Sequence, residues 1–98
     1  MAFIKTSKAK AAKNRRKATA YKRVCAQVDA RDGVFCRVCW AGCQRGRHHH
    51  HLTFRSRGGK DTTDNIVVVC GPCHEDIHQH RLTVTGSGNG HLQIERIA

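Results

Sequence analysis

Two Cys-x2-Cys pairs constrain the fold of this chain more than any other feature of its sequence. Cys36 and Cys39 form the first pair, and Cys70 and Cys73 form the second. Four thiolates at this spacing suit the tetrahedral coordination of a structural zinc ion, which leaves no open position for chemistry. Residues 40–69 between the pairs are more than a simple zinc ribbon needs. We therefore expect a functional element in this insertion.

The alternative is that these cysteines form disulfides. The start of the chain, Met-Ala-Phe-Ile followed by lysines, lacks the apolar stretch of a secretory signal. No apolar run is long enough to span a bilayer. We therefore expect a cytoplasmic protein, in which paired cysteines bind metal. Of the remaining cysteines, Cys43 could compete with Cys39 as a ligand, whereas Cys25 is predicted to be a buried thiol.

The charge of the chain points to a polyanionic partner. Its 98 residues suit one small domain with a modest core, and such domains often need a structural metal. The formal net charge is +11. Basic residues cluster near the N-terminus, and nucleic acid is the leading candidate for a partner of such a surface.

The N-terminal third divides into two predicted parts. Residues 1–17 are rich in Lys and Arg, contain no acidic residue, and are predicted to form a flexible basic arm. A helix is predicted from Ala18 to Arg31, with Gly33 as a left-handed C-terminal cap. Its apolar stripe has helical spacing and consists of Tyr21, Val24, Cys25 and Val28.

The rest of the chain predicts a small α+β domain spanning residues 18–98. β-branched runs and alternating patterns indicate strands, Gly-rich stretches indicate turns, and a Pro after Cys70 suits the first turn of a helix. The expected elements are a strand over 48–54, a loop over 55–65, a strand over 66–69, a helix over 72–80, and a C-terminal hairpin over 82–97.

Six histidines lie in or beside this insertion. His74 and His78 are one helical turn apart, so both imidazoles project from one face and can reach one cation. The other four form the run His48–His51. Successive residues of a regular strand face opposite sides, so His49 and His51 would share one face and the other two the opposite face. Not all four can serve one site.

These residues resemble the HNH endonuclease family, whose members include colicin-type DNases and many phage and mobile-element nucleases. The resemblance covers residues 36–80 and implies a ββα-metal (His-Me finger) fold stabilised by a four-cysteine zinc site. The matching motifs, in order, are His50-His51-Leu52, Arg55-Ser-Arg-Gly-Gly59, Asn65, and Cys70-x2-Cys73-His74-x3-His78.

The resemblance also implies the role of each site residue. His51 would be the general base, and Asn65 would hold the histidine-bearing loop by hydrogen bonds. The catalytic divalent cation (Mg²⁺, Mn²⁺, Ni²⁺ or Zn²⁺) would be held by His50, His74 and His78. The structural zinc found in many members would be bound here by Cys36, Cys39, Cys70 and Cys73.

A register one residue earlier is the alternative, with His50 as the base and His49 as the ligand. The apolar Leu52 and the distance to Arg55 favour the first register. That register requires the strand to bend or end, so that His50 and His51 reach one site.

The sequence thus predicts a metal-dependent endonuclease that cuts or nicks double-stranded DNA with low sequence specificity. The expected products carry 5′-phosphate and 3′-hydroxyl ends, and a bacterial or phage-infected cell is the expected setting. The alternatives are a non-catalytic zinc-containing DNA-binding module and an accessory subunit of a larger DNA-processing complex with a targeting partner. The residues expected to contact DNA phosphates are Lys13, Arg15, Arg16, Lys17, Arg55 and Arg57.

Overall fold

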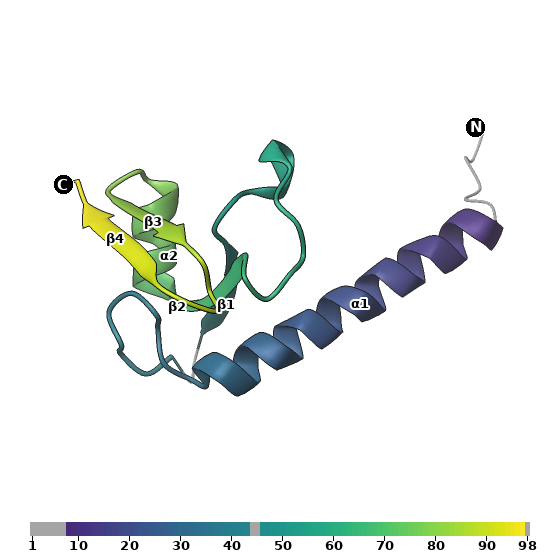
Figure 1. Ribbon diagram of the computed structural model, residues 1–98, viewed down its shortest axis with the longest axis horizontal. Coiled ribbons are helices and arrows are strands. Elements are labelled where there is room, and N and C mark those ends of the chain that lie inside the picture. The colour runs from purple at the N-terminus through teal and green to yellow at the C-terminus, as the bar shows by residue number, and fades with distance from the viewer. Residues whose placement is uncertain (1–7, 44–45, 98) are drawn as a thin grey trace.

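A two-stranded antiparallel hairpin followed directly by a helix forms the centre of the structure (Figure 1). The computed structural model describes residues 8–43 and 46–97, with residues 8–12 described by their backbone alone. This is the predicted small α+β arrangement. Its elements, in order, are α1 (Lys8–Asp32), β1 (Arg47–His51), a short 3-10 turn (Arg55–Arg57), β2 (Ile66–Cys70), α2 (Gly71–His78), β3 (Leu82–Gly86) and β4 (Leu92–Arg96).

Strand β2 lies at the centre of the hydrophobic core and is buried along its whole length. Its β-branched side chains suit a strand that is covered on both faces. Val28 of α1 and Ile77 of α2 belong to the same apolar cluster as β2, so the β1–β2 hairpin lies between the two helices. Burying each such apolar side chain contributes about 1.5–3 kcal/mol.

Helix α1 begins at Lys8, so the predicted start at Ala18 was wrong. Alanine, lysine and arginine are strong helix formers, and their propensity outweighs the repulsion between the positive charges. The expected basic arm therefore overlaps α1 from Lys8 onward, and its residues 1–7 lie outside the described part of the chain. The N-terminal half of α1 extends away from the hairpins (Figure 1). Among the described residues, no helix has the length and apolar character needed to cross a membrane.

The C-terminal end of α1 is fixed to β2 by the buried carboxylate of Asp32. Asp32 accepts hydrogen bonds from Arg31 (2.7 and 2.9 Å), from Arg37 (2.7 Å) and from the backbone N–H of Val68 (3.0 Å). Burial alone would raise the pKa of Asp32, but these hydrogen bonds outweigh it and hold the pKa below its usual value. Gly33 then ends the helix with φ of 67°, as predicted.

The C-terminal hairpin packs against α2. Leu82 and Val84 of β3 are buried, and Asp76 of α2 accepts hydrogen bonds from Arg81 and Arg96. The expected hairpin is confirmed. Helix α2 ends at His78 rather than at His80, because His80 has the left-handed φ of 58°.

Candidate metal centres

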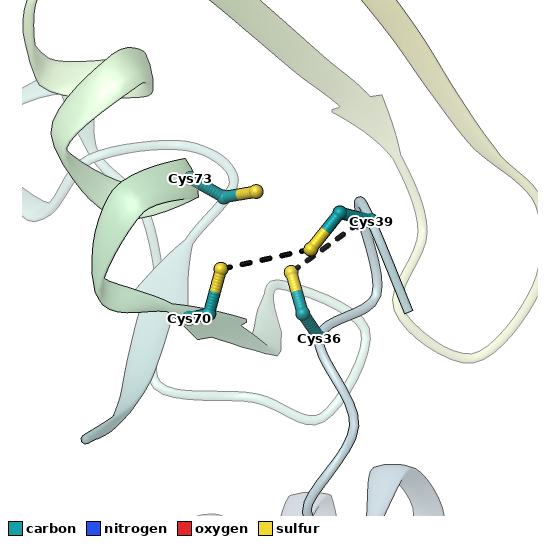
Figure 2. Close-up of side chains that lie close together, drawn as sticks. All are labelled: Cys36, Cys39, Cys70 and Cys73. Atoms are coloured by element: carbon teal, nitrogen blue, oxygen red, sulfur yellow. Dashed lines mark hydrogen bonds between the residues drawn. The ribbon is translucent and has the colours of Figure 1, made fainter. Parts of the chain in front are cut away.

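The four predicted zinc ligands come together between a turn and the junction of β2 with α2. Figure 2 shows their side chains pointing toward one another. All four sulfur atoms lie within 4.8 Å of one another, and Sγ of Cys39 is 3.7 Å from Sγ of Cys70. Two thiolates on one tetrahedral zinc ion are about 3.8 Å apart, given a Zn–S distance of about 2.3 Å. The cluster therefore fits a structural metal such as zinc.

The backbone around Cys36 favours its thiolate. Burial opposes ionisation of this thiol, but backbone N–H groups outweigh burial and lower its pKa to about 7. Two of them, those of Val38 and Cys39, lie 3.3 and 3.4 Å from its Sγ. Cys43 does not belong to the cluster. Its thiol instead donates a hydrogen bond to the Val34 carbonyl at 3.0 Å, and burial raises the pKa of this thiol. Cys25 is buried on α1, as predicted.

Three histidines form a second cluster across β1 and α2. One ring nitrogen from each of His50, His74 and His78 lies within 4.8 Å of the others. The Nε2 atoms of His74 and His78 are 3.0 Å apart. Two nitrogens at about 2.1 Å from one cation, at a right angle, would be about 3 Å apart. The donor set therefore fits one divalent cation with coordination positions left open.

The environment of His50 keeps its imidazole neutral. His50 is only 4% exposed. Burial, followed by the neighbouring His74 and His78, lowers the pKa of His50 to about 4. Burial also lowers the pKa of His74. At neutral pH both rings therefore offer the lone pair that a metal ligand needs.

Strand alternation divides the histidine run between the two helices. His48 stacks on His74 of α2, with ring centroids 4.5 Å apart. His49 faces the other side, where its Nε2 lies 2.7 Å from Oδ1 of Asp29 on α1. The structure therefore brings His50, and not His49, to the histidine cluster. This geometry matches the first of the two registers.

His51 is the last residue of β1 and lines the same cleft as the histidine cluster. This open cleft has a volume of about 330 Å³. The Nε2 of His51 lies 2.8 Å from Oδ1 of Asp61, and its ring stacks on that of Tyr21 at 6.1 Å. Because β1 ends here, His50 and His51 can border one cleft despite facing different neighbours. The other residues that line the cleft are His49, Phe54, Arg55, Ser56, His74 and His78.

Asn65 explains why β1 stops at His51 instead of continuing to Phe54, as the sequence predicted. Its side-chain oxygen accepts from Thr53 N–H at 2.8 Å, and its amide nitrogen donates to the carbonyls of Thr53 (3.0 Å) and Lys60 (2.9 Å). These bonds turn the chain out of the sheet immediately after β1. Asn65 therefore ties the segment that follows His51 to the loop that contains Lys60.

The predicted phosphate contacts lie on two elements. Arg55 borders the cleft, where its Nε donates to Asp61 at 2.9 Å and its guanidinium lies 4.7 Å from the centre of the Tyr21 ring. Arg57 is exposed on the same 3-10 turn. Exposed positions along α1 are occupied by Lys13, Arg15, Arg16 and Lys17.

Sequence reasoning missed Asp61 and the approach of Tyr21 to the site. Tyr21 was assigned only to the apolar stripe of α1, and no pattern in the sequence links it to His51. The one sequence feature that could have pointed to Asp61 is its position in the loop between Arg55 and Asn65.

Residues 36–80 match the family model described as HNH endonuclease. The matched segment is a little under half of the chain. This segment contains all four clustered cysteines and all three clustered histidines. Both centres therefore lie in the segment that is similar to HNH endonucleases.

Two curated proteins are similar to parts of the chain. The Type IV methyl-directed restriction enzyme EcoKMcrA of Escherichia coli is 52% identical over 29 residues, which are 30% of this chain and 10% of that protein. Anaredoxin of Nostoc sp. is 29% identical over 58 residues, which are 59% of this chain and 75% of that protein. The match thus spans about a tenth of the restriction enzyme. No solved structure matches the chain.

Proposed function

We propose that this protein is a metal-dependent DNA endonuclease that hydrolyses phosphodiester bonds and leaves 5′-phosphate and 3′-hydroxyl ends. The observation that carries the proposal is the convergence of His50, His74 and His78 beside His51 in one open cleft, within the segment that matches the HNH endonuclease family. A structural role for these imidazoles would not require three ring nitrogens to face a common point.

In this mechanism the clustered and the separate histidines have different tasks. His50, His74 and His78 would hold Mg²⁺, Mn²⁺, Ni²⁺ or Zn²⁺, which when bound stabilises charge on the phosphate and on the leaving 3′ oxygen. His51 is outside this cluster, so its ring is available to take a proton from the attacking water. The water oxygen then bonds to phosphorus as the P–O3′ bond breaks.

Two adjoining surface hollows that lead to this cleft support the proposed path of DNA. The first hollow runs along α1 between Arg15 and Arg23 and meets a second at Ala20. The second is bordered by Lys17, Lys60 and Arg55, and Arg55 also borders the metal cleft. Cations along this path suit successive backbone phosphates, which carry no sequence information. We therefore propose double-stranded DNA as the substrate, cut with low sequence specificity.

A non-catalytic DNA-binding module or an accessory subunit of a larger complex would account for the charge and for the cysteines. Neither alternative uses the histidine cluster. They are distinguished by whether the isolated protein cleaves DNA in the presence of a divalent cation.

The test is cleavage of supercoiled plasmid with each of Mg²⁺, Mn²⁺, Ni²⁺ and Zn²⁺, with EDTA as the metal-free control. We expect nicked or linear products that DNA ligase can reseal, because ligase needs 5′-phosphate and 3′-hydroxyl ends. His74→Ala should abolish cleavage, whereas His91→Ala, which alters an exposed histidine outside both clusters, should not. Folded, zinc-loaded protein that binds plasmid but never cleaves it would support the binding-module alternative.

A further inference from the structure

Asp61 contacts two residues of the cleft but has no role in the mechanism above. It lies in the loop between the 3-10 turn and β2, and its carboxylate is about one third exposed. The same oxygen, Oδ1, is 2.8 Å from Nε2 of His51 and 2.9 Å from Nε of Arg55. Asp61 therefore links His51, the proposed base, to the guanidinium group of Arg55 at the edge of the cleft.

The chemistry of this contact fixes which nitrogen of His51 carries the proton. The hydrogen bond from His51, supported by that from Arg55, holds the pKa of Asp61 below its usual value. Asp61 is therefore ionised at neutral pH, and an ionised carboxylate can only accept hydrogen bonds. Nε2 of His51 must be the donor, which leaves Nδ1 unprotonated in the neutral ring.

The orientation of the His51 ring is fixed from a second direction by α1. The Tyr21 ring lies nearly parallel to that of His51, with an interplanar angle of 16°. Arg55, which is bound to Asp61, also covers the Tyr21 ring. Tyr21 of α1 and Asp61 of the loop thus hold one imidazole from two directions, and Arg55 links these two residues.

We propose that Asp61 is a positioning residue for DNA hydrolysis, which it serves by holding His51 in the tautomer and orientation that present Nδ1 to the attacking water. This inference rests on the proposed nuclease function. In the reaction a proton passes from water to Nδ1, and the water oxygen forms a bond to phosphorus. The P–O3′ bond breaks, its electron pair stays on the 3′ oxygen, and that oxygen takes a proton from solvent.

The kinetic test compares Asp61→Asn and Asp61→Ala with wild-type protein. We expect kcat to fall roughly 10–100-fold, the usual effect of removing the hydrogen-bond partner of a functional histidine. The KM for DNA should stay within about twofold of the wild-type value. Asp64→Asn is the matched control, because it removes the same charge from an exposed position in the same loop. An unchanged kcat with a lower KM would overturn the proposal and show that Asp61 only repels DNA.

A second readout does not depend on activity. Ring nitrogen NMR spectra of the zinc-loaded protein, without added catalytic cation, report the tautomer of His51, which is assigned by comparison with His51→Ala. Wild type should show protonated Nε2, and Asp61→Ala should show a mixture of both tautomers. The same tautomer in both proteins, or protonated Nδ1 in wild type, would contradict the proposal. If wild type does not cleave DNA but shows the expected tautomers, only the proposed function fails.

Discussion

His50 and His51 are neighbours in the chain but lie in different surroundings. His50 is buried against α2, beside His74 and His78, and burial keeps its ring neutral for a cation. His51 faces Asp61 and the Tyr21 ring instead. The alternation of a strand that ends at His51 thus separates the proposed ligand His50 from the proposed base His51.

Tyr21 offers a direct check on the packing of α1 against this site, because it is the only tyrosine in the chain. Burial, followed by a hydrogen bond with Cys25, raises the pKa of Tyr21 to about 12. The folded-state pKa exceeds the unfolded value of about 10, so the associated stabilisation is present below pH 10 and is lost as pH rises toward 12.

Ultraviolet absorbance of the phenolate should therefore show Tyr21 ionising well above pH 10 in the native protein. In denaturant the same group should ionise near pH 10. Identical titration curves in the two conditions would show that the packing of α1 does not bury Tyr21 in solution.

At the scale of elements, the sequence predicted best what depends on residues close together in the chain. The β2 strand, α2 and the C-terminal hairpin carry local patterns, and each lies within one or two residues of its expected bounds. The proximity of His74 and His78 was predictable because helical spacing alone places them on one face. Such signals need no knowledge of tertiary contacts.

Other boundaries depend on contacts that no local pattern records. β1 ends early because Asn65 binds the backbone of Thr53 from across the loop. Asp61 meets His51 only after that loop has closed. The start of α1 differs from the prediction for another reason. The helix propensity of Ala, Lys and Arg outweighs the repulsion between the positive charges.

The four-cysteine cluster joins the turn after α1 to the junction of β2 and α2, so loss of its metal should unfold the core. Cys36→Ser is predicted to lose zinc and cooperative structure, since metal binding and folding are coupled in such sites. Cys43→Ser is the matched control, because Cys43 is buried but outside the cluster. Atomic absorption and circular dichroism measure the two effects. A folded, zinc-free Cys36→Ser protein would refute this role for the cluster.

At the scale of the whole molecule, the charge of the protein and the shape of α1 act together. The chain carries a formal net charge of +11, and α1 extends well beyond the two hairpins (Figure 1). Tyr21 and Asp29 connect this helix to His51 and His49 of β1. A duplex that follows α1 would therefore be led to the cleft, and its binding would depend on salt concentration.

Replacing Arg15, Arg16 and Lys17 together by glutamine tests this path. We expect weaker DNA binding and a less steep dependence of log Kd on log salt, by about 0.9 for each phosphate that the variant no longer neutralises. Fluorescence anisotropy over a range of salt concentrations measures both. Arg81→Gln with Arg96→Gln is the control, because these cations pair with Asp76 on α2. An equal effect in both variants would indicate that only net charge matters.

We propose that His51 is the general base beside a cation held by His50, His74 and His78. The most direct test of this proposal is single-turnover cleavage of a DNA duplex at saturating protein and cation, comparing wild type with His51→Ala and His49→Ala. General-base catalysis contributes roughly 10²–10⁴-fold, so His51→Ala should cleave slower by that factor while still binding DNA and metal. His49→Ala should retain most of the rate. Wild-type cleavage by His51→Ala would contradict the account.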